Sequence, residues 1–368
     1  MVNVPKTMRS LVAPKKGPPS TFEIASMPTP SIKEPTDVLI HVRAASLGTG
    51  DVQIAGGKLE VFHKATFPLQ IGNSGAGVVV AVGDGVKHLK VGDEVYGANI
   101  SKPMFRGEPP GFVSEYTVCP ENLVIRKPPS LSFEEAASLT PMVVAAYQVI
   151  KRGLQVRGEE SLEGKTVFVP GALSGTGSII IQVAKNFFGA AKIISTVSTA
   201  KVPLVEEYLP GMVDQIIDYK TQKVGDLVPQ GTVDFAVNTQ MSSMDDCIAA
   251  LDKKTGTLMS ITSIPTKKVA KEIIGADRFP WWFGVILDLA QYYYTWKFWG
   301  TNIYHEMVSG SPDIREDLEM SGEIVALGKV KAVMRVVELE DIEAVRKNCE
   351  EVYAIKGGIG KLVVVISK

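Results

Sequence analysis

The chain contains 368 residues, 45% of them hydrophobic and 21% charged, with a formal net charge of -1. This is the composition of a globular protein, and the length predicts more than one domain. Lys and Arg form no basic tract, which argues against a nucleic-acid partner. Cys119, Cys247 and Cys349 lie far apart and form no C-x-x-C pair, which favours a reducing compartment over a disulfide framework.

The first residues contain no apolar run of the kind that marks a secretory signal, so a cytoplasmic location is expected. One apolar segment, 279–300, has the length of a membrane span, but Asp288 and Lys297 interrupt it. Asp288, Gln291 and Thr295 are spaced to form one polar stripe. We therefore predict an amphipathic helix and no membrane span. Its expected apolar face consists of Trp282, Ile286, Leu289, Tyr293 and Trp296.

Short strands with glycine turns are predicted in the first third of the chain. Residues 38–44 alternate between apolar and polar side chains, 76–82 form a buried run that ends at a Gly-Asp-Gly turn, and 112–118 give another strand. Many short strands of this kind predict a partly open β-barrel.

The pattern changes near residue 130. Ser132 and Glu135 form a capping box ahead of a helix that is expected to continue to about Lys151. Strands then alternate with helices, which predicts a parallel, doubly wound sheet. The expected strands are 165–170, 192–196, 215–217, 233–237 and 257–261, and the expected helices between them include 178–188 and 202–208.

The last segments are expected to return to the first domain, with a strand within 330–338, a helix over 339–353 and a strand over 361–366. We therefore expect one domain at 1–140, completed by about 325–368, and a second at 141–324 that contains the aromatic segment 279–304.

A glycine-rich loop carries the clearest chemical signal. It follows a buried strand, precedes a helix, and allows a pyrophosphate to approach the helix N-terminus. An ordinary strand–helix turn is the alternative interpretation. The residues expected to contact the cofactor here are Gly171, Ser174, Gly175, Thr176 and Gly177, together with Asn238 after a later strand.

The next strand bears on the choice of cofactor. An enzyme that uses NAD would present Asp or Glu about 20 residues after the loop. This chain instead has hydroxyl groups, Ser195 and Ser198 among them, followed by Lys201. Such groups attract a 2′-phosphate, so NADPH is favoured over NADH. The alternative is that Lys201 is a solvated lysine at a helix start.

Taken together, these motifs resemble the medium-chain dehydrogenase/reductase superfamily over nearly the whole chain. The segment 72–97 (GNSGAGVVVAVGDGVKHLKVGDEVYG) and the linking-helix segment SLSFEEAASLTPMVVAAYQVI carry the resemblance. Its zinc-free quinone oxidoreductase and enoyl or alkenal reductase branches look most similar. The resemblance implies an α/β fold with a Rossmann doubly wound parallel sheet plus a GroES-like, partly open β-barrel catalytic domain. It also implies that Lys201 and Tyr219 hold the 2′-phosphate.

The same resemblance argues against a metal site. Zinc-dependent members carry a Cys where this chain has Gly48, and a His-Glu pair where it has Asn73-Ser74. Their lobe of four cysteines has no counterpart between Ser101 and Gly111. Zinc needs three or four converging ligands, so none is expected.

Without a metal, reduction of an activated C=C bond or of a quinone requires the least charge stabilisation from the protein, because the substrate itself delocalises the charge. A zinc-free carbonyl reductase or dehydrogenase, and a non-catalytic NADPH-binding sensor, are the alternatives. Tyr147, Asp51 and Asn73 are the candidate catalytic residues, although Tyr147 also fits a packing role. The substrate is expected to be a small apolar molecule, and a homodimer stays open. The aromatic segment is either a packing element or a lid over the substrate.

Overall fold

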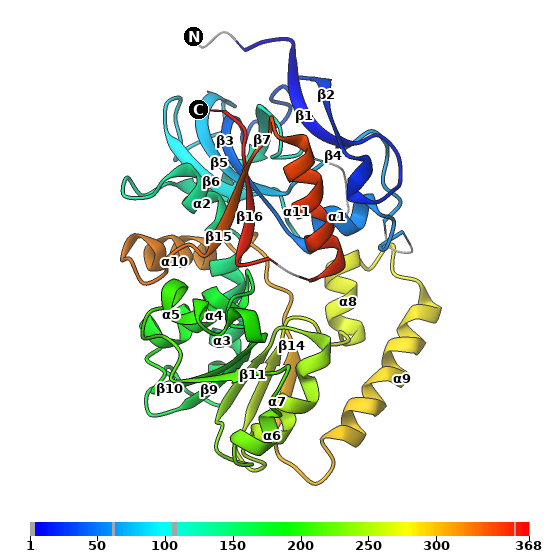
Figure 1. Ribbon diagram of the computed structural model, residues 1–368. Coiled ribbons are helices and arrows are strands. Elements are labelled where there is room, and N and C mark those ends of the chain that lie inside the picture. The colour runs from blue at the N-terminus through cyan, green and yellow to red at the C-terminus, as the bar shows by residue number, and fades with distance from the viewer. Residues whose placement is uncertain (1–3, 61–62, 105–108, 357, 368) are drawn as a thin grey trace. The chain divides into compact units, whose positions relative to one another are not determined.

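The computed structural model describes residues 4–60, 63–104, 109–356 and 358–367. The chain divides into two compact units. Unit 1 comprises Met1–Met142, Ser311–Gly322 and Ala332–Lys368, and unit 2 comprises Val143–Gly310 and Glu323–Lys331. Figure 1 labels the elements of both units. Within the described residues, none of the helices combines the length and the apolar character that crossing a membrane requires.

Unit 1 is built on β-sheets. The larger sheet has the strand order β15-β16-β3-β5-β6-β8, with β7 paired to β3, and the smaller one has the order β2-β1-β4. The pairing of β16 with β3 is antiparallel, so the end of the chain completes the sheet that its first third begins. The strands are β1 (Thr7–Ala13), β2 (Glu23–Pro28), β3 (Asp37–Leu47), β4 (Leu69–Gln70), β5 (Ser74–Val82), β6 (Glu94–Ala98), β7 (Tyr116–Pro120), β8 (Val124–Arg126), β15 (Met334–Glu338) and β16 (Lys361–Val365).

Alternation of side chains explains the core of unit 1. In β3, Ile40, Val42 and Ala44 are buried, whereas His41 and Arg43 on the opposite face are only partly buried. Ile40 and Val42 join one hydrophobic cluster that also includes Leu362 and Val364 of β16. The helices of the unit are α1 (Thr49–Ala55), α2 (Phe133–Leu139) and α11 (Ile342–Ala354), while α10 (Arg315–Ala326) is divided between the two units.

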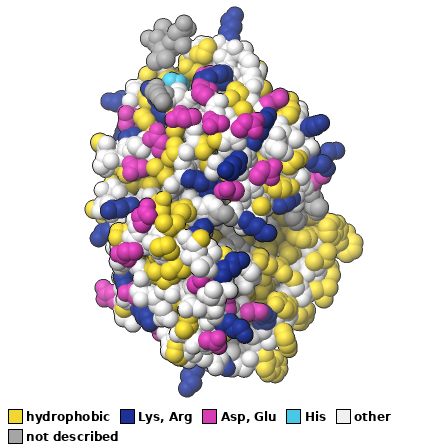
Figure 2. Space-filling view, in the orientation of Figure 1, with side chains coloured by type: hydrophobic (Ala, Val, Ile, Leu, Met, Phe, Trp, Pro, Cys, Tyr) yellow, Lys and Arg dark blue, Asp and Glu magenta, His cyan; other side chains and the backbone are white. Residues whose placement is uncertain are grey.

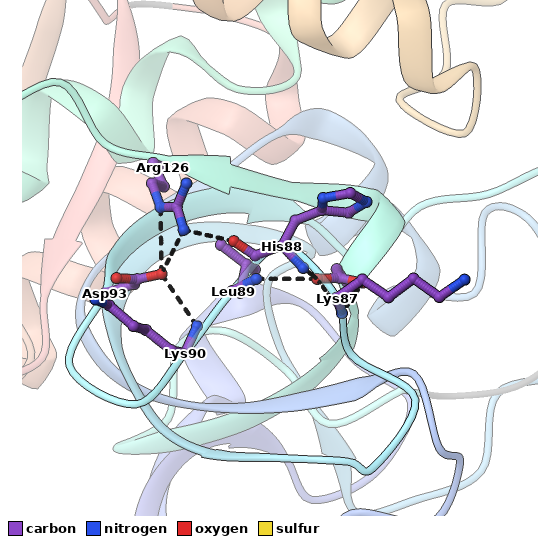
Figure 3. Close-up of polar contacts among 7 residues, drawn as sticks. Lys87, His88, Leu89, Lys90, Asp93 and Arg126 are labelled. Carbon is purple, nitrogen blue, oxygen red and sulfur yellow. Dashed lines mark hydrogen bonds and ion pairs between the residues drawn. The ribbon is translucent and has the colours of Figure 1, made fainter.

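One buried carboxylate organises the loop between β5 and β6. Glu121 accepts hydrogen bonds from the backbone N–H groups of Lys87, His88 and Leu89 at 2.6–3.1 Å. Close by, Arg126 binds the carboxylate of Asp93 and the carbonyl of His88, as Figure 3 shows. Burial opposes the charge of Glu121, but the three N–H donors outweigh it and hold the pKa of Glu121 below its usual range. This loop is therefore held by side chains instead of by strand pairing.

Unit 2 contains a six-stranded sheet in which every pairing is parallel. Its order is β11-β10-β9-β12-β13-β14, which is the order 3-2-1-4-5-6 of a doubly wound sheet. This confirms the predicted fold. The strands are β9 (Thr166–Pro170), β10 (Lys192–Val197), β11 (Gln215–Asp218), β12 (Phe235–Asn238), β13 (Thr257–Ser260) and β14 (Tyr304–Met307). The helices are α3 (Met142–Gln155), α4 (Gly177–Asn186), α5 (Leu204–Tyr208), α6 (Val224–Leu227), α7 (Met244–Ala250), α8 (Lys267–Ile274) and α9 (Trp281–Lys297).

Two predicted elements differ from the structure. The helix expected from Ser132 to about Lys151 begins with its capping box, in which Ser132 and Glu135 exchange hydrogen bonds, but it breaks into α2 and α3. Pro141 explains the break, because it lacks an N–H and disfavours a helical Thr140, which is extended here. The strand expected at 112–118 is instead β7, shifted toward the C-terminus. Part of the Ser101–Gly111 segment, residues 105–108, lies outside the described residues.

The aromatic segment forms α9, but its orientation corrects the predicted amphipathic pattern. Gly284, Leu287 and Tyr294 are the buried residues, and Gln291, expected in the polar stripe, binds the carbonyls of Ile264 and Pro265. The side chains of the expected apolar face are exposed instead of packed in a core. We call this exposed set the aromatic stripe; it consists of Trp281, Trp282, Val285, Ile286, Leu289, Tyr292, Tyr293, Trp296 and Trp299.

Candidate functional site

The glycine-rich loop lies at the carboxyl end of β9, where ligands of doubly wound sheets bind. Gly171 has φ +78°, a conformation that favours glycine. Its carbonyl accepts the N–H of Ser174, whose hydroxyl accepts the N–H of Gly177 at 2.9 Å. A Cβ atom at Gly177 would lie only 2.3 Å from the carbonyl oxygen of Gly171. The loop is therefore a closed turn in which glycine is required at both ends.

This turn fits a pyrophosphate. It leads directly into α4, a ten-residue helix whose first turn contains no acidic side chain. The backbone dipoles at this N-terminus favour an anion. A Cβ at Gly171 would lie 2.8 Å from the side-chain amide of Gln240, so the bare glycine allows the loop after β12 to approach this turn closely. Thr239 ties these loops together by donating to the carbonyl of Pro170 at 2.7 Å.

The residues expected near a 2′-phosphate follow β10 and β11. Ser198 precedes the short 3₁₀ turn Thr199–Lys201, and its carbonyl accepts the N–H of Lys201. Tyr219 is exposed and follows β11, with its N–H bonded to the carbonyl of Val197. Parallel pairing of β10 with β11 thus brings these loops side by side.

An acidic residue stands in this same neighbourhood. Asp218 ends β11 opposite Val197 of β10. Its carboxylate accepts hydrogen bonds from the N–H of Lys220 and the hydroxyl of Thr221. A hydrogen bond from the Thr199 side chain, together with these, lowers the pKa of Asp218, so the group is charged at neutral pH. The sequence motif did not reveal this carboxylate, because it belongs to the third strand instead of the second.

Two other residues that were expected to contact the cofactor form hydrogen bonds within the protein instead. Ser195 lies in the middle of β10, fully buried, and its hydroxyl donates to the carbonyl of Val169. Asn238 is fully buried at the end of β12, where it donates to Ser260 at 3.2 Å and accepts from Ser243 at 2.8 Å. Both side chains are therefore engaged inside the sheet, and the carbonyl of Asn238 accepts the N–H of Ile261. Thr176 precedes α4 as its N-cap residue.

A second group of expected residues meets in unit 1. Asp51, in the first turn of α1, accepts a hydrogen bond from the backbone N–H of Gly48 at 2.6 Å. Its other oxygen accepts one from the side-chain amide of Asn73, also at 2.6 Å. Asn73 lies just before β5, and Gly72 beside it adopts φ +93° to place it there. The structure thus brings Asp51 and Asn73 into direct contact.

Lys361 completes this group and was not expected from the sequence. It begins β16, and the register of that strand with β3 places it opposite Gly48. A Cβ at Gly48 would lie 3.0 Å from the ammonium of Lys361, which therefore lies against the bare glycine. Burial lowers the pKa of Lys361, partly offset by the Asp51 charge. Burial likewise raises the pKa of Asp51, opposed by Lys361 and by both hydrogen-bond donors.

Tyr147 lies away from the glycine loop. On α3, its ring stacks against Phe188 with centroids 5.9 Å apart and meets the edge of Phe187 at 6.0 Å. Those two residues follow the C-terminal end of α4, whereas the glycine loop precedes its N-terminal end. The structure therefore places Tyr147 among packed aromatic side chains and does not bring it to the cofactor loop.

The residues present do not fit a zinc ion. Gly48 has no side chain, and the amide nitrogen of Asn73 is turned toward the carboxylate of Asp51. Among the described residues, no group of three or more His, Cys, Asp or Glu side chains could hold a metal. The cysteines at 119, 247 and 349 are all free and buried.

Comparison with known proteins finds a matching domain in unit 1 and several relatives in sequence. Residues 34–129 match the alcohol dehydrogenase GroES-like domain. The chain is 37% identical over 227 residues to the 2-methylene-furan-3-one reductase of Solanum lycopersicum, a match covering 61% of this chain and 56% of that protein. It is 36% identical over 266 residues to the chloroplastic NADPH-dependent alkenal/one oxidoreductase of Arabidopsis thaliana, covering 72% of this chain and 65% of that protein. The matches thus span less than two thirds of either relative.

A solved structure extends the likeness of the fold to both units. The quinone oxidoreductase from Coxiella burnetii superposes with a TM-score of 0.72 at 21% identity, over 98% of this chain and 99% of that one. The matched domain, the sequence relatives and the strand order of unit 2 agree with one another. Residues 34–129 match the alcohol dehydrogenase GroES-like domain, and the chain is similar in sequence to a furanone reductase and to an alkenal/one oxidoreductase. Its fold is that of the Coxiella burnetii quinone oxidoreductase.

Proposed function

We propose that this chain is an NADPH-dependent reductase that acts on an activated C=C bond, in an enone, enoyl or alkenal compound, or on a quinone, without zinc. The observation that carries the proposal is the closed glycine turn at the head of α4, set at the switch point of a 3-2-1-4-5-6 sheet. The names of the two sequence relatives supply the substrate class, since both describe a C=C bond conjugated with a carbonyl group.

The residues of unit 2 would hold the cofactor. The N-terminus of α4, with Gly171 and Gly177 flanking the turn, suits the pyrophosphate. Ser198, Lys201 and Tyr219 follow β10 and β11, where the 2′-phosphate of NADPH is expected. When bound, NADPH supplies a hydride. Ser195 and the side chain of Asn238 are left out of this set, because both are engaged inside the sheet.

The residues of unit 1 would act on the substrate side. Asp51 and Asn73 hold each other in one orientation, and the Lys361 ammonium lies next to them. In a reduction of this kind, negative charge develops on the carbonyl or quinone oxygen. A nearby cation and hydrogen-bond donors stabilise such a charge. We assign Lys361 and Asn73 this electrostatic role, and Asp51 the role of a positioning residue that orients Asn73.

The same geometry supports the proposal that the reaction proceeds without zinc. The position of Gly48 offers no ligand, and Asn73 already donates to Asp51. Polarisation of the substrate then depends on hydrogen bonds and on Lys361. This favours substrates that delocalise charge themselves over unactivated alcohols.

The test is a panel assay. Purified protein is mixed with NADPH and with enones, alkenals, quinones and simple aldehydes, and oxidation of NADPH is followed for each. We expect turnover of the conjugated substrates and little of the simple aldehydes. Turnover of simple aldehydes alone would favour a carbonyl reductase, and tight NADPH binding without turnover would favour a sensor.

Two further expectations belong to this proposal. The substrate is expected to be apolar, which the panel tests by varying chain length. A cytoplasmic location is expected from the sequence, although the Arabidopsis relative is named as chloroplastic. Fluorescence imaging of the tagged full chain tests the location, and light scattering of the purified protein decides whether it is a homodimer.

A further inference from the structure

The aromatic stripe of α9 is an unusually large exposed apolar surface. Trp281 is 80% exposed and Trp299 is 82% exposed, and the large side chains between them are exposed as well. All four tryptophans of the chain lie in this segment. Figure 2 shows hydrophobic side chains gathered over the region where Figure 1 places α9. Exposing so much apolar surface is costly in water, and a patch of this kind marks an interaction site.

The shape of the stripe restricts what can cover it. At 3.6 residues per turn, its nine members fall within one arc of about 140° along the whole helix. The buried residues Gly284, Leu287 and Tyr294 lie on the opposite side. A helix that pairs with one other helix uses a narrower seam, restricted to two positions in seven. The stripe is therefore wide and convex, which suits a broad, deformable surface better than a single helix.

The side-chain chemistry points in the same direction. Six of the nine members are Trp or Tyr. These rings join a large apolar body to one polar group, and they are enriched where a bilayer meets water. Seams between two protein helices are built mainly from aliphatic residues such as Leu and Ile. In the stripe the aliphatic residues are only Val285, Ile286 and Leu289.

Cations border the stripe. Lys271 lies 5.7 Å from the ring centroid of Phe279 at one end of the segment, and Lys268 and Arg278 near it are exposed. Lys297 at the other end lies 5.2 Å from the ring centroid of Tyr293, but its charge is paired with Asp245. Residues 266–300 contain five Lys or Arg and three Asp or Glu. A basic rim beside an apolar face is the pattern of helices that lie in the plane of a bilayer with anionic headgroups. The lysine stems can follow the apolar surface while their ammonium groups reach the headgroups.

We propose that α9 docks this protein on the surface of a lipid bilayer that carries anionic headgroups. The stripe lies at the level of the headgroups and upper acyl chains, and the opposite face of the helix stays packed on unit 2. This inference goes beyond the proposed reaction and does not depend on it. It places the protein where lipophilic conjugated carbonyl compounds and quinones concentrate.

The tryptophans provide a direct readout, since every one of them lies in the segment concerned. The full chain is mixed with phosphatidylcholine vesicles, with and without phosphatidylglycerol, and the emission of tryptophan is recorded. We expect a shift to shorter wavelength on adding vesicles, quenching by brominated acyl chains, and stronger binding to the vesicles that contain phosphatidylglycerol. Unchanged emission with both kinds of vesicle, together with no co-sedimentation, would overturn the proposal.

A double variant localises the effect while keeping all four tryptophans. Ile286→Glu with Leu289→Glu places two charges in the centre of the stripe, and both residues are more than half exposed. We expect vesicle affinity to fall by more than about tenfold. Leu327→Glu is the matched control, because Leu327 is 67% exposed and lies outside the segment, and its vesicle affinity should not change. Far-UV circular dichroism and the thermal unfolding temperature of each variant show that it is folded.

The same variants distinguish a lipid surface from a second copy of the chain. Light scattering is recorded without lipid. A wild-type dimer that the double variant converts to a monomer would show that a second copy covers the stripe, and this would overturn the proposal. An oligomeric mass that is the same in both proteins, with vesicle binding lost only in the double variant, supports it.

Discussion

The side-chain amide of Asn73 donates a hydrogen bond to Oδ1 of Asp51 across 2.6 Å, while the backbone N–H of Gly48 occupies the other oxygen at the same distance. The family resemblance implies that zinc-dependent members carry metal ligands at the positions of Gly48 and Asn73. Here they form a compact hydrogen-bonded group beside the Lys361 ammonium. This contact is the structural basis of the account of a reaction without zinc.

The first prediction concerns this contact. Asp51→Asn keeps the shape of the side chain but removes the charge that orients the Asn73 amide. We expect kcat to fall about tenfold or more, because an electrostatic group that is no longer preorganised loses much of its effect. The dissociation constant of NADPH should change little, since the glycine turn uses other residues. Stopped-flow rates and fluorescence titration with NADPH measure the two quantities.

The matched control for this prediction is Asp341→Asn, in which another helix-start aspartate is changed. Asp341 caps α11 by accepting the N–H of Ala344 at 3.0 Å. It should lower the thermal unfolding temperature and leave kcat unchanged. If Asp51→Asn behaved in the same way, Asp51 would have a purely structural role.

The second prediction concerns the choice of cofactor. Lys201→Ala should weaken NADPH binding by about tenfold to a hundredfold, the effect of one charge-assisted hydrogen bond. NADH lacks the 2′-phosphate, so its binding should change much less. Calorimetric titration with both cofactors measures the difference. Equal losses for NADPH and NADH would refute the assignment of Lys201.

The neighbouring carboxylate refines this prediction. Asp218 is charged at neutral pH and is held by Thr199 and Lys220, in the same loop region as Lys201. Its charge opposes that of a 2′-phosphate. Asp218→Asn should therefore strengthen NADPH binding relative to NADH, which is the opposite direction to Lys201→Ala.

The third prediction concerns metal content. The purified protein should contain no stoichiometric zinc and should keep its activity in an excess of chelator, because Gly48 and Asn73 supply no ligands. Elemental analysis of the active protein and assays with EDTA measure this. One tightly held zinc per chain, with activity lost on its removal, would contradict the mechanism.

The fourth prediction concerns the stability of unit 1. Glu121→Gln should lower the free energy of unfolding by about 1–3 kcal/mol at neutral pH, because three backbone N–H groups, that of Leu89 buried, lose a charged acceptor. The folded pKa of Glu121 is below its unfolded value, so its contribution is present above about pH 4.3 and disappears as the pH falls through the folded pKa. The two proteins should thus converge in stability in acid. Urea unfolding at several pH values measures the gap, and a gap independent of pH would refute this explanation.

The sequence predicted those features that depend on local pattern. Alternation in β3, the capping box of Ser132 and Glu135, and the glycine turn before α4 all depend on residues close together in the chain. The doubly wound sheet followed from the order of its strands and helices. The break before Pro141 was not predicted, although it also has a local cause, since proline cannot continue a helix in that position.

What the sequence could not predict depends on distant partners. Lys361 meets Gly48 only through the register of β16 on β3, which joins residues more than 300 positions apart. Periodicity identified an apolar face on α9 but not the surface that it meets. The structure turns that face outward because Leu287 and Tyr294 on the opposite face are buried, with Tyr294 in the core of unit 2. Ser195 likewise had the residue type of a phosphate ligand, but the pleat of β10 directs its hydroxyl to Val169.

Isotope labelling can follow the delivery of hydride to a conjugated C=C bond in the absence of zinc. The protein is incubated in chelator with an α,β-unsaturated aldehyde and NADPH that carries deuterium at the transferable position, and the product is analysed by mass spectrometry and NMR. We expect a saturated aldehyde with deuterium on the β-carbon. An allylic alcohol with deuterium on the former carbonyl carbon, or no turnover until zinc is added, would contradict it.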